Sequence, residues 1–281
     1  AYAFSAIQHG TIALEIKSGY GLELDTELKM LRVINKLKKN LPIEVVPTFL
    51  GAHDFPPEYQ NNRDDYVKLI CERMIPAIAD EGLASYCDCF VDKGYYTIEQ
   101  ARRIFDTAIH YGMKIKMHAD ELANVGAGKL AGEIGAISAD HLLFVSDESL
   151  KAMADGGTIA TLLPGTSYFI RMPYAPARKI IEKNIPIALA SDFNPGSCFT
   201  ENMQIISSFA VMQLGLSCEE ALVASTLNGA AAIELADRIG SIEIGKEASF
   251  VVLNCKNYVD MFYHFGINHV ESVWSKGEKI V

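Results

Sequence analysis

Ionisable side chains follow several apolar segments of this chain, at the point where each segment ends. Five of these polar ends cover residues 17–20, 51–54, 118–121, 140–141 and 191–194. They include the histidines at positions 53, 118 and 141, three of the seven in the chain. Core packing alone does not explain so many ionisable groups at segment ends, so the pattern indicates a site that binds a ligand or catalyses a reaction.

His118 and Asp192 form a candidate pair of metal ligands. An imidazole nitrogen and a carboxylate oxygen both suit zinc or ferrous iron. Taken singly, a hydrogen-bonded structural histidine or an aspartate that caps its own loop would explain either residue better. Their shared position at the ends of apolar segments favours a metal site over these alternatives.

Glu121 follows His118 by three residues, and this spacing suggests proton transfer beside the metal. If a strand gives way to a helix at this point, both side chains can face the same opening, where a carboxylate can hold or relay a proton. The alternative is an acidic residue in the first turn of a helix, which the helix dipole favours. His141 is a candidate base or oxyanion partner, or else a neutral histidine that donates to a backbone carbonyl.

A second group of candidates lies in loops that could contact a substrate. Residues 194–197 have the composition of a turn, whose backbone and amide groups can donate to a ligand or simply close a tight loop. Tyr20 and His53 are polar loop residues that could touch a substrate, although each alone is better explained as an ordinary surface residue. Cys198 lies beside the loop but lacks an activating base, so we expect no nucleophilic thiol.

Seven β-like segments, each followed by a helix-like stretch, must position these side chains. They start near residues 12, 43, 85, 113, 136, 158 and 187, so the spacing runs from 22 residues (136 to 158) to 42 residues (43 to 85). A parallel strand is reached through a crossover helix, and a βα unit needs a stretch of about this length. The periodicity predicts a helix over residues 23–39, and capping boxes at Thr97 and Ser217 predict two more, the second ahead of an alanine-rich segment to Ala236.

These elements predict an α/β fold, a TIM-like (β/α)8 barrel with about seven of its eight strands, over residues 1–237. A doubly wound sheet is the alternative, but Gly19-Tyr20-Gly21 lacks the G-x-G-x-x-G pattern of its phosphate loop. For residues 238–281 we expect the C-terminal part of a small β-sandwich. Its elements would be a short strand near residues 240–244, a second strand to Leu253, and a hairpin turning at Lys276-Gly277.

The composition excludes several classes of function. The chain of 281 residues carries 25 basic and 35 acidic side chains, a formal charge of −10, which argues against nucleic-acid binding through a broad basic face. Every apolar run is shorter than the roughly 18 residues of a membrane span, and no secretory signal is visible. The six cysteines include no C-x-x-C pair, so we expect no zinc finger and a reducing, cytoplasmic setting.

Six segments closely resemble imidazolonepropionases, the histidine-degradation branch of the amidohydrolase superfamily. They are Glu15-Ile-Lys-Ser-Gly-Tyr-Gly21, Pro47-Thr-Phe-Leu-Gly-Ala-His53, His118-Ala-Asp-Glu121, Asp140-His141-Leu142, Leu162-Leu-Pro-Gly165 and Ala190-Ser-Asp-Phe-Asn-Pro-Gly196. The combination of K-S-G-Y-G with D-F-N-P-G is specific to that family. The resemblance runs from about Gly10 to the C-terminus and implies a metal-dependent hydrolase barrel.

The resemblance also implies an activity and a set of residues. The reaction would be hydrolysis of the cyclic amide 4-imidazolone-5-propanoate, a small molecule, to N-formimidoyl-L-glutamate in histidine catabolism. One zinc or iron ion would activate a water, and the protein would be a homodimer. By resemblance, His118 and Asp192 are metal ligands, and Glu121, His141 and Asp192 are catalytic. The residues that resemble substrate contacts are Tyr20, His53, Glu121, Asn194, Gly196 and Ser197.

One feature of the family has no counterpart here, because the 281 residues contain no H-x-H motif. Family members carry this motif on a first barrel strand that follows half of a β-sandwich, so we expect a further segment upstream of Ala1. Two alternatives to the implied activity stay open. One is another cyclic amidohydrolase or a deaminase that acts on a nitrogen heterocycle, and the other is a non-catalytic barrel if Ala1 is the native N-terminus.

Overall fold

The computed structural model describes all residues 1–281, which form two compact units. One unit comprises Leu14–Thr158 and holds the first five strands, so we call it the β1–β5 unit. The other comprises Ala1–Ala13 and Ile159–Val281 and is called the β6–β10 unit. No helix in either has both the length and the apolar character that crossing a membrane would require. The domain boundary that the sequence suggests after residue 237 stays a prediction.

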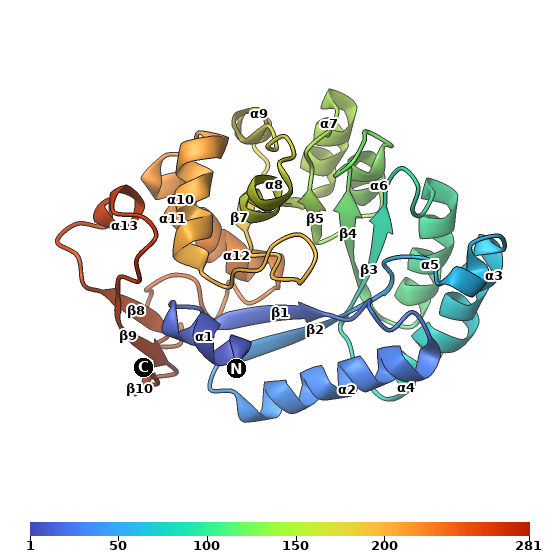
Figure 1. Cartoon of the computed structure of the whole chain (residues 1–281), viewed down its shortest axis with the longest axis horizontal. Helices are drawn as coiled ribbons and strands as arrows, with labels where there is room; N and C mark the ends of the chain where they lie inside the picture. Colours follow the sequence, from blue (N-terminus) through green and yellow to red (C-terminus); the bar gives the residue numbers. More distant parts are fainter. The chain divides into compact units, whose positions relative to one another are not determined.

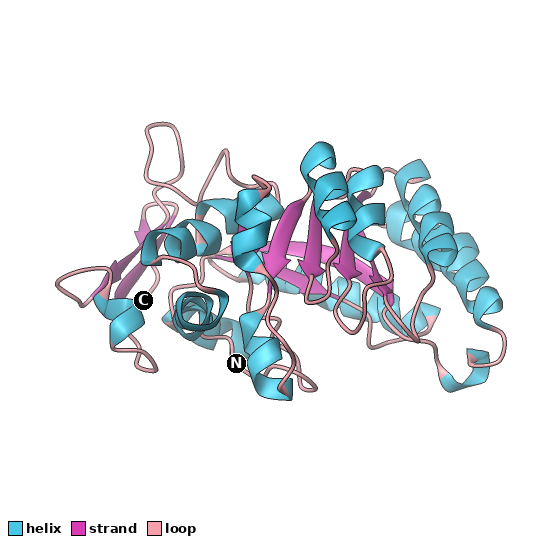
Figure 2. Cartoon of the chain, turned by 90° about the horizontal axis from the view of Figure 1, so that it is seen from above, coloured by secondary structure: helices cyan, strands magenta, loops and turns pink.

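The β1–β5 unit is a parallel sheet whose strands are neighbours in chain order. At least one helix connects each strand to the next, as the βα alternation predicts (Figures 1 and 2). The strands are β1 Ala13–Lys17, β2 Glu44–Ala52, β3 Tyr86–Val91, β4 Lys114–Ala119 and β5 Ser138–His141. The helices are α2 Leu24–Asn40, η1 Pro57–Tyr59, α3 Arg63–Leu69, the π-helix η2 Ile70–Met74, α4 Ile75–Asp80, α5 Ile98–His110, α6 Ala127–Glu133 and α7 Asp147–Gly156.

Helix α2 forms where the periodicity predicts it. Leu28, Leu31 and Ile34 recur at helical spacing and are buried, and the helix packs against β2 (Figure 1). Acidic residues in its first turn and lysines in its last turn stabilise the helix through favourable interactions with its dipole. The buried stripe also contains a charged residue, Glu27, whose role becomes clear at the site.

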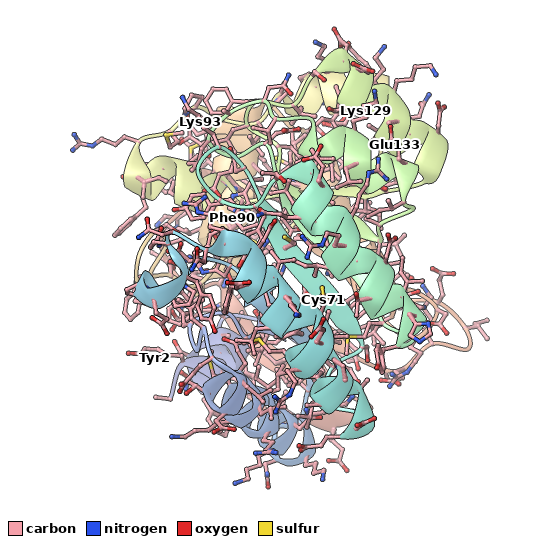
Figure 3. All side chains as sticks on the ribbon, turned by 90° about the vertical axis from the view of Figure 1, so that its right-hand side faces the viewer. Tyr2, Cys71, Phe90, Lys93, Lys129 and Glu133 are labelled. Carbon is pink, nitrogen blue, oxygen red and sulfur yellow. The ribbon has the colours of Figure 1, made fainter.

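Helix α5 begins at the predicted capping box. Thr97 Oγ1 accepts from the backbone N–H of Gln100, and Gln100 Oε1 accepts from the backbone N–H of Thr97. The two bonds satisfy N–H groups that the first turn of a helix leaves without partners. Helix α6, by contrast, carries Lys129 and Glu133 on an exposed face (Figure 3), where the pair is screened by water.

Strand register decides which side chains of the sheet become neighbours. Phe90 on β3 lies opposite His118 on β4, and His118 lies opposite Asp140 on β5. Side chains alternate along a strand, so Asp88 shares a face with Phe90, and Lys116 shares one with His118. The same face of the sheet therefore carries an imidazole and several charged groups, all buried.

The β6–β10 unit contains two short parallel strands, several helices and a small antiparallel sheet. Its strands are β6 Ile159–Leu162, β7 Ile187–Leu189, β8 Phe250–Leu253, β9 Val270–Ser275 and β10 Glu278–Lys279. Its helices are α1 Tyr2–Gln8, α8 Pro164–Ile170, α9 Ala177–Glu182, α10 Met203–Leu214, α11 Cys218–Ser225, α12 Leu227–Ala232 and α13 Asp260–Tyr263. The capping box at Ser217 is present and begins α11, but the alanine-rich segment is interrupted at Thr226.

The C-terminal segment confirms one prediction and corrects another. Strands β9 and β10 pair across the predicted turn at Lys276-Gly277. The strand expected near residues 240–244 is wrong, because the side chains of Ile242 and Ile244 are 91% and 108% exposed and no strand lies beside them. An extended segment becomes a strand only when a neighbouring strand takes its backbone hydrogen bonds, and this one has none.

Candidate active site

His118 is the last residue but one of β4, and its side chain lies on the buried face and is only 9% exposed. Its Nδ1 lies 3.0 Å from Oδ1 of Asp88, and its backbone N–H donates to the same oxygen at 3.1 Å. A carboxylate oxygen can only accept, so Nδ1 carries the proton and Nε2 is the nitrogen left for a ligand. Burial opposes the charged imidazole, but the Asp88 carboxylate outweighs it and raises the pKa of His118.

Asp88 belongs to a buried ionic network. Lys17 on β1 places its Nζ 2.5 Å from Oδ2 of Asp88 and 2.5 Å from Oδ2 of Asp140. Glu15 lies two residues before Lys17 on β1, and its Oε2 accepts from Nζ of Lys116 at 2.7 Å. Burial opposes each of these charges, yet the carboxylates of Asp140, Asp88 and Glu15 hold the pKa of Lys17 above its usual range. The pKa values of Asp88 and Asp140 are lowered in turn by the neighbouring cations.

Asp88, His118 and Asp140 could also be considered as a cation cage. Their ligand atoms lie within 4.8 Å of one another, and all three are buried. An imidazole with two carboxylates is a donor set that divalent metals accept. The ammonium of Lys17 already contacts both carboxylates, so the atom that best fits a metal in this unit is Nε2 of His118.

Glu121 and His141 lie side by side next to His118. Oε1 of Glu121 is 3.5 Å from Nδ1 of His141, and the rings of His141 and His118 have centroids 5.2 Å apart. His141 is 3% exposed, and its Nδ1 is a buried polar atom without a hydrogen-bond partner. A buried polar atom without a partner is uncommon in proteins and marks a place where a ligand or a catalytic role is expected. This observation supports the fit of a metal-bound water or substrate at this site.

The backbone around these residues is unusual. Asp120 and His141 have φ values of 49° and 75°, and Leu142 follows with 62°. Non-glycine residues rarely adopt this left-handed conformation, and such strain is concentrated at functional sites. Glu121 lies in a loop and not in the first turn of a helix, because α6 begins only at Ala127. The helix-dipole alternative for Glu121 is therefore wrong.

Asp92 holds the loop that carries Glu121. Its carboxylate accepts from the backbone N–H groups of Glu121 at 2.7 Å, Leu122 at 2.8 Å and Ala123 at 3.1 Å. Asp92 is 3% exposed, so water does not compete for these bonds. Asp92 is not among the predicted site residues, although it directly follows the buried strand β3 and so has the strand-end signal of the other candidates.

Tyr20 and His53 are brought to the same end of the sheet. Their ring centroids are 5.1 Å apart, and His53 lies 5.9 Å from Phe90, itself on β3 (Figure 3), and 6.3 Å from His118. The Tyr20 loop is held by Glu27, which is fully buried in α2 and accepts from Gly19, Gly21 and Leu22 backbone N–H groups. Glu27 is also not among the predicted site residues, and its signal in the sequence is a charge on the apolar stripe of a helix.

The remaining predicted site residues lie in the β6–β10 unit. Asp192 follows β7 with a φ of 50°, and its Oδ2 accepts from Oγ1 of Thr166 at 2.5 Å. The expected turn is present, because Oδ1 of Asn194 accepts from the backbone N–H groups of Gly196 at 2.9 Å and Ser197 at 2.7 Å. The Asn194 side chain is thus engaged within its own loop. That His118 and Asp192 share an ion stays a prediction, as do the substrate contacts.

The thiol of Cys198 is buried and unsuited to nucleophilic attack. Burial raises its pKa to about 11, so at neutral pH it is almost entirely protonated. A protonated, buried thiol is a poor nucleophile, so the position of Cys198 disfavours a catalytic role for it.

The model of the amidohydrolase family matches residues 12–280 of the sequence. The chain belongs to that family. This amidohydrolase is 48% identical over 276 residues to the imidazolonepropionase of Thermoanaerobacter pseudethanolicus, a match that covers 98% of the chain and 66% of that relative. The chain thus spans slightly less than two thirds of the length of this curated relative. Family membership and the buried imidazole of His118 together indicate a divalent metal.

Solved structures show the same fold for this amidohydrolase. A triazine hydrolase variant has a TM-score of 0.82 at 12% identity and is matched over 100% of this chain and 70% of its own. An adenosine deaminase from Xanthomonas campestris with bound zinc has a TM-score of 0.76 at 18% identity, over 99% of this chain and 70% of its own. The predicted fold class, a hydrolase barrel with its strands in βα alternation, is thereby confirmed.

Proposed function

We propose that the protein containing this chain is an imidazolonepropionase, which hydrolyses 4-imidazolone-5-propanoate to N-formimidoyl-L-glutamate. The observation that carries the proposal is the group formed by His118, Glu121 and His141 at the ends of β4 and β5, with a buried imidazole nitrogen that lacks a partner. Relatives named imidazolonepropionase that are 45–48% identical over nearly the whole chain support it.

His118 and Asp192 are the residues of this chain that would hold the metal, zinc or iron. The bound ion would supply Lewis acidity and lower the pKa of a coordinated water. Two protein ligands alone hold a divalent ion weakly, because catalytic zinc sites use three. The remaining ligands would come from outside the 281 residues.

Glu121 and His141 move protons in this proposal. Glu121 accepts the N–H of the substrate ring and assists the transfer of a proton to the departing nitrogen. His141, at 3.5 Å from Glu121, orients the attacking water or polarises the carbonyl, and Asp192 takes up the proton of that water. The loop bonds of Asp92 keep Glu121 within reach, which matters because a displacement of about 1 Å can lower a rate by two orders of magnitude.

The substrate contacts in the proposal are Tyr20, His53, Asn194, Gly196 and Ser197. The Tyr20 and His53 rings, with centroids 5.1 Å apart and planes tilted by 55°, offer aromatic surface and hydrogen-bonding atoms to a planar five-membered ring. We further propose a cytoplasmic homodimer, on the strength of the family resemblance. The small, anionic, nitrogen-rich substrate fits a metabolic enzyme of this kind.

Turnover by the complete protein tests the proposal. We expect metal-dependent loss of the ultraviolet absorbance of the imidazolone, abolished by chelation and restored by zinc or ferrous iron. His118→Ala should remove both the bound metal and the activity, whereas exposed Glu148→Gln should retain both. A protein that holds a full equivalent of metal yet prefers a purine or a hydantoin would show another amidohydrolase activity instead. No turnover of any ring substrate would leave a non-catalytic barrel.

A further inference from the structure

The buried network behind His118 suggests which residues set the direction of this ligand. Asp88 is completely buried, and one of its oxygens, Oδ1, receives both the backbone N–H and the ring Nδ1 of His118, at 3.1 and 3.0 Å. A single atom therefore fixes the main chain and the side chain of the same residue. Histidines that bind metals commonly donate their other ring N–H to such an acceptor, which sets the tautomer and the orientation of the ring.

Lys17 holds Asp88 in turn. Its Nζ lies 2.5 Å from Oδ2 of Asp88, the oxygen that faces away from His118, and equally close to Oδ2 of Asp140. A divalent ion bound by the same two carboxylates would meet the ammonium group, and the two cations would repel each other. Neither carboxylate is therefore well placed to be a ligand itself, and Asp88, which bonds His118, is placed to orient that ligand.

We propose that Asp88 is a positioning residue for the metal ligand His118, and that Lys17 locks Asp88 so that Nε2 of the imidazole is directed at the metal. The inference rests on the proposed function only through the role of His118 as a ligand. It assigns Asp88 and Lys17 to orientation, and it excludes Asp88 and Asp140 from the metal's own coordination sphere.

Asp140 provides a matched control for Asp88. Both aspartates are buried, and both accept from the same Lys17 Nζ at 2.5 Å. Asp140 takes its other hydrogen bond from Oγ of Ser138, at 3.2 Å, and makes none with His118. Asp88→Asn and Asp140→Asn therefore each remove one negative charge that contacts Lys17. Only Asp88→Asn also changes the group that accepts from His118. An asparagine at position 88 can still accept from the backbone N–H, while its charge is lost.

The first test measures release of zinc from the complete, zinc-loaded protein to a chromophoric chelator. Losing the partner of a metal-bound histidine usually lowers metal affinity about 10- to 100-fold. We expect this loss to appear as release of zinc from the Asp88→Asn variant that is faster than from wild type by about the same factor. Asp140→Asn should release zinc at close to the wild-type rate. Equal rates of zinc release from the two variants would overturn the proposal. If both were fast, the loss of a charge beside Lys17 would explain the release, and if both were unchanged, Asp88 would have no effect on it.

A second test needs no variant of Asp88 and so survives if that variant fails to fold. Nitrogen-15 NMR of the zinc-loaded wild type, with the His118 signals assigned by their loss in His118→Gln, should show a protonated Nδ1 and zinc on Nε2. Zinc on Nδ1, or a wild type that binds no zinc, would contradict the assignment of Asp88. If these zinc measurements agree with expectation but the imidazolone is not hydrolysed, the proposed function fails and the positioning role stands.

Discussion

The carboxylate of Glu121 lies 3.5 Å from Nδ1 of His141, a buried nitrogen that no other group of the protein satisfies. The distance is slightly too long for a hydrogen bond, and it leaves the two side chains close enough to share a proton or a water. Apo sites commonly hold their catalytic groups in this looser geometry, which tightens when substrate binds. The pair therefore behaves as one unit in the predictions that follow.

Loss of either member of this pair should slow hydrolysis strongly. We expect Glu121→Gln and His141→Asn each to lower kcat by about 10²- to 10⁴-fold, the usual contribution of a general acid or base. The double variant should be little worse than the poorer single variant, because residues that act together are not additive. Steady-state kinetics on the metal-loaded complete protein gives all three values. Fully multiplicative effects would show that the two side chains act independently.

Glu27 should control the loop that carries Tyr20. In Glu27→Gln the amide keeps one acceptor oxygen and cannot serve the three backbone N–H groups of Gly19, Gly21 and Leu22 as a carboxylate does. Hydrogen bonds to charged groups contribute about 1.5–3 kcal/mol, so we expect a loss of that order in the free energy of unfolding. KM should rise more than kcat falls. Lys29→Gln, an exposed change in the same helix, is the control, and it should leave KM unchanged and shift the free energy of unfolding by less than about 0.5 kcal/mol.

The cap of α5 should contribute measurably to stability and not to catalysis. Thr97→Ala removes the oxygen that accepts from Gln100 N–H, and we expect a loss of about 1 kcal/mol in the free energy of unfolding. Denaturant titration measures this, and kinetics should stay unchanged. Asp106→Ala, exposed on the same helix, should shift stability by less than about 0.5 kcal/mol. An unchanged denaturant midpoint for Thr97→Ala would show that the capping box makes no net contribution to the free energy of unfolding.

Cys198 should resist alkylation in the folded protein. With its pKa raised to about 11, only about one thiol in a thousand is ionised at pH 8, and burial also blocks access. The alkylation rate of Cys198 should rise about tenfold per pH unit between pH 8 and pH 10, because the ionised fraction of the thiol rises by that factor. The half-buried Cys255 should be alkylated before Cys198. Unfolding in guanidinium exposes both thiols and should make their alkylation rates similar. Peptide mapping after timed iodoacetamide labelling measures both rates, and early labelling of Cys198 would contradict the expectation.

Local patterns in the sequence determined the elements and the identity of many site residues. Each of the seven parallel strands begins within two residues of the predicted start, and the capping boxes at Thr97 and Ser217 begin α5 and α11. Such signals depend on spacing within one segment, so no tertiary information is needed. Since the carboxyl ends of parallel strands meet at one edge, Tyr20, His53, His118 and His141 could also be assigned to a common end.

Only the tertiary structure decided which groups hold the site in place. Asp88 and His118 are 30 residues apart in sequence, and Lys17 and Asp140 are 123 apart. Their contacts depend on the strand register and on how the sheet of the β1–β5 unit curls, and neither is written in any single segment. Residues 240–244 failed as a strand for the same reason, because a strand exists only when a neighbour supplies its hydrogen bonds. The sequence by itself indicated which side chains can do chemistry, and the tertiary structure determined which partners orient them.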